Sequence, residues 1–424
     1  MQTNEPDQIP SGYNRLLRKF NICIVFSLVI YLVCIYSQRK FGTGDTYYAL
    51  MTWWDHMFYN GFRGILTMNI PVEEGGAGAN YTSIWYAVIW LFIKLRLYPH
   101  FPIEYCIKSI AVVCSVLSAL TVKRIVQHYR PDAKYMPNLA LVVTLYMPAF
   151  LLDVVKTNLP DSTYLMFALM ALLAFIKDKK SLAWVLLGFG ICFKLMAIYL
   201  APFFIYFYLK DFDKYKISES MSPFFIIIPI LVCSVPHVIA GGTWFGGVIE
   251  PLFNRAGGYM QCFSYSLWQF MPNYAENFTI FSVGLTLLVF AFIFFFVQRF
   301  VPENQKNEVE YYILLPLFPM ICYYLLPAQH EGYFAMAAVF SFIVWCIKPV
   351  KRYFIIFFGS NLLLFIAYCA VSIRWYYEGF LTAGTSIIYD VPFLSLCFAS
   401  IMFYAGYHIY KNSDFYGRPA QKPE

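Results

Sequence analysis

Stretches of apolar residues recur along this chain at about the length that crosses a lipid bilayer. An α-helix rises ~1.5 Å per residue, so roughly 20 apolar residues span a hydrocarbon layer of ~30 Å. These stretches do not alternate between polar and apolar residues, as the strands of a membrane β-barrel would. The sequence therefore predicts an all-α, polytopic membrane protein of about 12 transmembrane helices. The clearest stretches are 20–36, 103–122, 137–152, 162–176, 222–240, 279–297, 353–371 and 391–409.

Composition narrows the class further. The chain is 60% hydrophobic and 13% charged, and the charged share is about half of the ~25% found in soluble domains. The formal net charge of +7 is concentrated in short loops, so it reports topology and we expect no nucleic-acid partner. The 11 cysteines occur singly in apolar stretches, without the spacing of metal sites or disulfide frameworks. We expect neither a metal nor a cofactor.

Clusters of lysine and arginine predict the orientation of the chain, because such clusters in short loops stay on the cytoplasmic side. We expect a cytoplasmic tail over 1–19 with no cleavable signal, a transmembrane domain over 20–410, and a cytoplasmic tail over 411–424. The basic clusters are Arg15–Lys19, Lys123–Arg130, Lys177–Lys180, Lys210–Lys216, Arg299–Lys306, Lys348–Arg352 and Lys411–Lys422. The expected extracytoplasmic loops are 38–81, 154–161, 241–277, 328–332 and 374–388.

This orientation constrains two segments. Between the outer loop 38–81 and the inner cluster at Lys123, the apolar stretches 82–97 and 103–122 cannot both cross, so we expect 82–97 to be re-entrant or interfacial. Segment 181–209 lies between two basic clusters and must cross twice. Two short helices broken around Lys194 would do so, and a broken helix at membrane depth is tolerated only where it lines a protein cavity.

Single ionisable residues in apolar surroundings mark candidate site positions. Asp45 follows the first apolar stretch, Lys194 lies in GICFKLMAIYLAP, and His330 with Glu331 lies in LLPAQHEGYFAMA. A charge in hydrocarbon costs at least a few kcal/mol, so such residues are kept mainly for function. The aromatic first outer loop mixes polar and apolar residues at helical spacing, which predicts amphipathic helices at the membrane surface.

These segments, in this order, resemble motifs of the GT-C superfamily of polyprenyl-phosphate-sugar-dependent glycosyltransferases, closest to bacterial mannosyltransferase-like proteins. GDTYYALMTWWDHMFYNGFRGIL (44–66) is similar to the family's acidic first loop, and GFGICFKLMAIYLAP (188–202) to its GLAFxFKLQAxxLxP element. The aromatic stretch 80–86 lacks the family's prolines, and Asn158–Asp161 keeps only the acid of Gly-Gln-x-Asp. Segment 265–273 resembles a later outer loop. Segment 327–334 resembles Pro-x-x-His-Glu-Arg-Tyr-Phe, with glycine in place of the arginine.

The resemblance implies a donor that is a polyprenyl-phosphate sugar and an acceptor that is a lipid-linked or surface glycan. The phosphate is a good leaving group, so one carboxylate suffices to take the proton of the acceptor hydroxyl. Asp45 matches the family's base. Asp55 is the rival, and Asp45 could instead be a helix cap. The implied location is a bacterial plasma membrane, with the active site extracytoplasmic and membrane lipids around it.

The leaving phosphate needs fixed positive charge in a dry site, and we assign this role to Lys194, His330, Arg255 and Arg374. Lys194 could otherwise extend its ammonium to the interface, His330 could be a satisfied interfacial histidine, and the two arginines could bind lipid head groups. Sugar contacts are assigned to Trp53, Trp54, Asp161, Tyr265, Gln269, Asn273 and Glu331. The alternative for each aromatic residue is the belt at the membrane interface.

Two other functions compete with glycosyl transfer. A transporter or flippase of lipid-linked sugars would share the composition, but it predicts charges in the middle of several spans and repeat symmetry. A surface-polysaccharide polymerase predicts a large arginine-rich outer loop. The polar groups of this chain fall on one face and its outer loops hold few arginines, which favours the glycosyltransferase.

Overall fold

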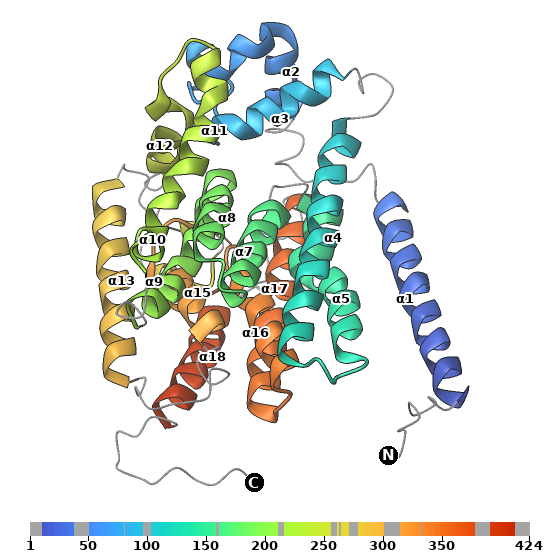
Figure 1. Cartoon of the computed structure of the whole chain (residues 1–424). Helices are drawn as coiled ribbons and strands as arrows, with labels where there is room; N and C mark the ends of the chain where they lie inside the picture. The colour runs from blue at the N-terminus through green and yellow to red at the C-terminus, as the bar shows by residue number, and fades with distance from the viewer. Residues whose placement is uncertain are drawn as a thin grey trace.

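The computed structural model of the chain is built almost wholly of helices (Figure 1). It describes residues 11–37, 51–79, 81–95, 103–157, 161–210, 216–255, 261–262, 264–270, 279–300, 314–330, 332–377 and 391–411. Within these ranges, strand structure is limited to a parallel pair of two-residue strands, β1 (Gln261–Cys262) and β2 (Gln329–His330). The predicted helical class is confirmed apart from this short pair.

The helices follow the predicted apolar stretches. In the first half they are α1 (Ser11–Ser37), α2 (Met51–Asn60), α3 (Ser83–Lys94), α4 (Ile103–Tyr129), α5 (Met136–Tyr146), α6 (Pro148–Leu152), α7 (Asp161–Ile176), α8 (Lys180–Phe193), α9 (Ala201–Lys210) and α10 (Ile217–Ser220). In the second half they are α11 (Ile227–Ile239), α12 (Trp244–Arg255), α13 (Thr279–Phe300), α15 (Leu314–Leu325), α16 (Ala335–Ile347), α17 (Lys351–Tyr377) and α18 (Val391–Lys411). Short 3₁₀ helices include η2 (Gly61–Thr67), η5 (Leu195–Leu200), η7 (Ser222–Ile226) and η8 (Leu267–Phe270).

Several helices are long and apolar enough to cross a membrane, judged by length and composition. Three single stretches pass, Lys108–Tyr129, Ser222–Ile239 and Lys351–Cys369. A fourth is the pair Met136–Tyr146 and Pro148–Val155, bent by 42° where Pro148 begins a new helix. Eight further apolar helical stretches of 10–17 residues lie within the part of the chain whose side chains are described, which is shorter than the roughly 20 residues needed for a straight crossing. A total of about 12 spans therefore stays a prediction.

The two segments constrained by orientation have the expected local form. The apolar stretch 82–97 forms α3, whose 12 residues extend over only ~18 Å at 1.5 Å per residue. Segment 181–209 is broken at Lys194, which has an extended backbone (φ −156°, ψ 127°) between α8 and η5. The short α3 is compatible with the predicted non-crossing segment. The extended backbone at Lys194 is the break predicted within 181–209.

The outer helices present apolar side chains at their surface. On α13, Ile280, Leu288 and Phe295 are 90%, 67% and 63% exposed. Contiguous apolar surface of this kind is rare on proteins surrounded by water and is typical of surfaces that face lipid or a partner. The exposed faces of the outer helices are thus compatible with a surrounding bilayer.

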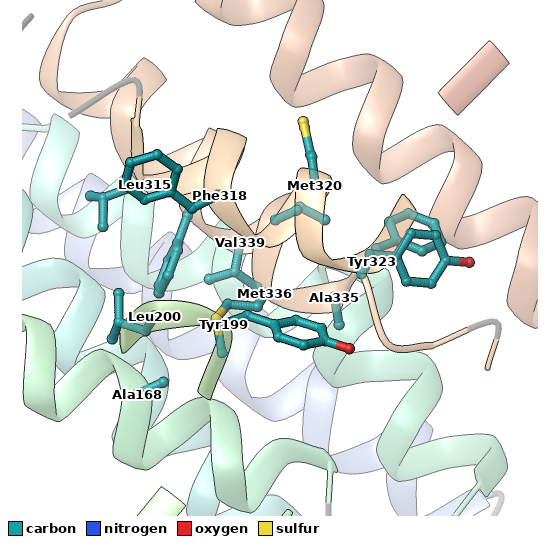
Figure 2. Close-up of a cluster of buried hydrophobic side chains, with 14 of the residues drawn as sticks. Ala168, Tyr199, Leu200, Leu315, Phe318, Met320, Tyr323, Ala335, Met336 and Val339 are labelled. Carbon is teal, nitrogen blue, oxygen red and sulfur yellow. The ribbon is translucent and has the colours of Figure 1, made fainter. Parts of the chain in front are cut away.

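The main core lies between the two halves of the chain. Tyr199 and Leu200 of η5 pack against α15 and α16, which contribute Phe318 and Met336 among others. Figure 2 shows these side chains meeting across the core, with the Tyr199 ring beside Ala335. The break after α8 is therefore held from one side by helices that come more than a hundred residues later.

A second, smaller cluster gathers the aromatic residues of 51–95. Trp53 and Trp54 of α2 are buried against Trp85 and Tyr86 of α3, and this unit lies at the end of the molecule beside α11 and α12 (Figure 1). The start of α3 fastens it to the helical bundle. Thr82 Oγ1 donates a hydrogen bond to the Cys192 carbonyl, and Ser83 Oγ donates to the Cys233 carbonyl at 2.7 Å.

Candidate functional site

A buried ion pair joins the first turn of α7 to the break after α8. Lys194 Nζ donates a hydrogen bond to Asp161 Oδ1. The side chains are 3% and 5% exposed, respectively, and the two residues are 33 positions apart in sequence. Burying an unpaired charge is costly, so the two opposite charges compensate each other in the buried interior.

The local sequence explains how Lys194 comes to point inward. The backbone N–H of Lys194 makes the last helical hydrogen bond of α8, donating to the Gly190 carbonyl at 2.9 Å. An ideal Cβ at Gly190 would lie 3.0 Å from the Ala197 Cβ. Glycine at this position therefore lets η5 fold back closely on the end of α8, with Lys194 at the bend.

Aromatic rings surround the Lys194 ammonium. The Nζ atom lies 4.7 Å from the centre of the Tyr333 ring and 5.8 Å from that of Tyr164. Ring faces attract a cation, and the attraction is larger where water is excluded. The hydroxyl oxygens of Tyr164 and Ser162 are buried and have no hydrogen-bond partner among the described residues. The surroundings of Lys194 thus combine aromatic faces with a tyrosine, Tyr164, whose buried hydroxyl is unsatisfied.

The start of α7 is capped by another buried acid, Asp153, which the sequence analysis did not single out. Its Oδ2 accepts a hydrogen bond from the Ser162 N–H at 3.0 Å. Asp153 is 0% exposed and begins a π-helical turn over Asp153–Thr157, a conformation often found at functional sites.

A second buried lysine was also missed. Lys108 of α4 is 3% exposed, and its Nζ donates to the Val155 carbonyl of the same π-helical turn at 3.3 Å. The signal that would find Lys108 and Asp153 is the one that marks Lys194. Each is a charged residue within a mostly apolar stretch, CIKSIAVV for Lys108 and PAFLLDVV for Asp153.

The segment before α16 brings the predicted histidine close to Lys194. His330 belongs to β2, and its ring lies 5.0 Å from the Tyr333 ring, which in turn faces the Lys194 ammonium. The preceding Gln329 is buried, and its Oε1 accepts a hydrogen bond from the Tyr199 hydroxyl at 2.8 Å. The segment is therefore fixed on both sides, by η5 and by the parallel pairing with β1.

Segment 264–270, predicted to be extracytoplasmic, packs against the same region. The Tyr265 N–H donates to the Tyr323 hydroxyl at 2.7 Å, and Trp268 Nε1 donates to the Leu325 carbonyl at 2.9 Å. The Tyr265 ring lies 6.1 Å from that of Phe334, next to Tyr333. Gln269 is partly buried in η8, and its Nε2 has no hydrogen-bond partner among the described residues.

Gly332 lies directly against the ion pair. An ideal Cβ at this position would be 3.0 Å from the Tyr368 hydroxyl and 3.5 Å from Asp161 Oδ2. The glycine stands where the family motif has arginine. In this packing any larger side chain would meet both polar groups, so the departure from the motif fits the presence of Asp161 beside Lys194.

The remaining predicted site residues either lie away from the Asp161–Lys194 pair or have side chains that the structure does not describe. Trp53 and Trp54 are buried in the aromatic cluster of 51–95, whereas Asp55 is exposed on the opposite side of α2. The helical character of this stretch is confirmed, and its location at a membrane surface stays a prediction. Arg255 and Arg374 lie in α12 and α17 with side chains outside the described set. Asp45, Asn273 and Glu331 lie outside the described residues, so their assigned roles stay predictions.

The described site suits the binding of an anionic group close to hydroxyl groups and aromatic faces. Within the part of the chain that the structure describes, no three His, Cys, Asp or Glu side chains gather as metal ligands do. Neither a known protein family nor a curated protein matches the chain in sequence. The likeness to GT-C motifs accordingly rests on the quoted residues alone.

Proposed function

We propose that the chain is an integral multi-pass membrane glycosyltransferase of the GT-C type. It would transfer a hexose from a polyprenyl phosphate to a lipid-linked or surface glycan on the extracytoplasmic face of a bacterial plasma membrane. The observation that carries the proposal is the meeting of Asp161, Lys194 and the 329–334 segment in one buried cluster. These residues come from three motif-like segments that are far apart in the sequence.

The proposed reaction is a single displacement. The acceptor hydroxyl oxygen bonds to the anomeric carbon as the bond from that carbon to the phosphate oxygen breaks, and the phosphate keeps the electron pair. Asp45 takes the hydroxyl proton. The Lys194 ammonium stabilises the leaving phosphate, because such charge acts most strongly where water is excluded. One displacement inverts the configuration at the anomeric carbon.

The test is an assay with the purified protein in detergent. A polyprenyl-phosphate hexose and a nucleotide sugar are offered in parallel, each with a lipid-linked acceptor, and the product is analysed by mass spectrometry. We expect a new glycosidic bond of inverted configuration from the lipid donor. Turnover with the nucleotide sugar alone would disprove the proposal.

Transport of a lipid-linked sugar is the second candidate, because Lys108 and Asp153 are further buried charges of the kind expected in a transporter. Reconstitution in vesicles separates the two functions. Movement of a fluorescent lipid-linked sugar between leaflets without any new glycosidic bond would favour transport. A new bond without such movement would favour transfer.

A further inference from the structure

We propose that Asp161 and the phosphate of a polyprenyl phosphate compete for the same group, the Lys194 ammonium. This inference rests on the proposed function and adds a role to Asp161, which would control access of the anion to Lys194. The carboxylate seen on Lys194 would then be exchanged for the phosphate when the lipid binds.

The first support is the charge balance of the pair. A buried ammonium needs an anion beside it, and here that anion is Asp161 Oδ1. Two further described neighbours of Nζ, the rings of Tyr333 and Tyr164, are uncharged. Exchange of the carboxylate for a phosphate oxygen keeps Lys194 paired, and it requires that the released Asp161 carboxylate find another hydrogen-bond donor.

The second support is independent of charge. Ser162 Oγ and Tyr164 Oη, on the same turn of α7 as Asp161, are fully buried and have no hydrogen-bond partner among the described residues. A buried hydroxyl without a partner costs ~1–3 kcal/mol. Phosphate carries several acceptor oxygens, so a phosphate at Lys194 would satisfy hydroxyl groups that the Asp161 carboxylate leaves unsatisfied.

The third support is that Asp161 can leave Lys194 without disrupting α7. The helix start is capped by Asp153, which accepts the Ser162 N–H. The second carboxylate oxygen, Asp161 Oδ2, already lies beside Gly332, where no side chain intervenes and where the Tyr368 hydroxyl is close. A turn of the Asp161 side chain toward Tyr368 would exchange an ionic partner for a hydroxyl donor.

The experiment measures binding of a polyprenyl monophosphate to the full-length protein in detergent, by intrinsic tryptophan fluorescence, with polyprenyl alcohol as the neutral control. We expect Asp161→Asn to bind the phosphate at least 5-fold more tightly than the wild type, since the competitor is removed. Lys194→Met should bind at least 10-fold more weakly. Ser162→Ala and Tyr164→Phe should each weaken binding about 3- to 10-fold, as expected for one lost hydrogen bond.

Asp153→Asn is the matched control, because it also removes a buried negative charge at the start of α7 but leaves the anion on Lys194 in place. We expect it to lower thermal stability without tightening binding. Equal tightening by Asp153→Asn would overturn the proposal in favour of a general charge effect. If Asp161→Asn folds and binds the polyprenyl phosphate no more tightly than the wild type, the proposal is overturned directly. If Asp161→Asn does not fold, unchanged binding in both Ser162→Ala and Tyr164→Phe overturns it.

Two further probes identify the ligand. Phosphatidic acid offers the same phosphate on a diacyl lipid, and inorganic phosphate offers it without a lipid. Tighter binding of phosphatidic acid than of the polyprenyl phosphate would overturn the isoprenoid ligand. The binding experiment measures no transfer and is separate from the transfer assay. If competition is observed but the transfer assay gives no product, only the proposed function is disproved. If transfer is observed but Asp161→Asn binds the phosphate more weakly, only the competition is disproved.

Discussion

The Lys194 ammonium lies 4.7 Å from the centre of the Tyr333 ring, although the two residues come from opposite halves of the chain. A cation over a desolvated ring gains ~0.5–2 kcal/mol. Tyr333→Leu should therefore lower the free energy of unfolding by about that amount beyond the loss of packing. Tyr333→Phe keeps the ring face and is the control. Thermal unfolding in detergent measures the stability of both variants. An equal loss of stability in Tyr333→Leu and Tyr333→Phe would show that the ring face contributes nothing.

The ion pair itself should show strong coupling. Lys194→Met leaves the Asp161 carboxylate buried without its cation, which should cost ~3–5 kcal/mol. The double variant Lys194→Met, Asp161→Asn removes both charges and should recover most of that loss. A double-mutant cycle on unfolding in detergent gives the coupling free energy. Additive losses would mean that the two charges do not stabilise each other.

Gly332 offers a test of the packing around the pair. The Cβ of Gly332→Ala would lie 3.0 Å from the Tyr368 hydroxyl, and such overpacking costs ~1–3 kcal/mol. Adding Tyr368→Phe removes the crowded oxygen and should recover part of the loss. Unfolding temperatures of the two variants make the comparison. If Gly332→Ala is as stable as the wild type, the close contact described for this site is incorrect.

Segment 38–81 holds the proposed base and its rival. Asp45→Asn should lower glycosyl transfer by at least ~100-fold, because an amide cannot accept the hydroxyl proton. Asp55→Asn is the matched control, since Asp55 is exposed on the side of α2 away from Trp53 and Trp54. Transfer is measured with a polyprenyl-phosphate hexose at saturating acceptor. Loss of transfer in Asp55→Asn, with Asp45→Asn active, would reverse the assignment.

Hydrophobic pattern and charge predicted the helices and the break at Lys194, because both depend on local sequence. The apolar runs place helices wherever the backbone must satisfy its own hydrogen bonds. The predicted orientation of the chain requires a break between Lys180 and Lys210, and the lone lysine marks its position. The same reasoning predicts that 82–97 is re-entrant or interfacial, and this stays a prediction.

Contacts between residues that are far apart in the sequence could not be predicted from the sequence alone. Asp161 was assigned to the sugar, whereas the structure pairs it with Lys194, and no local pattern encodes a contact between residues 33 positions apart. Trp53 and Trp54 were assigned to sugar stacking, and they are buried against α3 instead. An aromatic pair in an outer loop has the same sequence pattern whether it faces a ligand, the interface or its own core. The roles of these residues toward a substrate stay predictions.

The hydrogen bonds from Thr82 and Ser83 make the aromatic unit of 51–95 and the end of α8 thermodynamically linked. Thr82 holds the Cys192 carbonyl, two residues before Lys194, while Ser83 holds α11 through Cys233. A ligand that shifts the start of α3 must either break these bonds or carry the end of α8 with it. By reciprocity, if an anion at Lys194 changes the affinity of the aromatic unit for any ligand, that ligand changes the affinity of the site for the anion by the same factor.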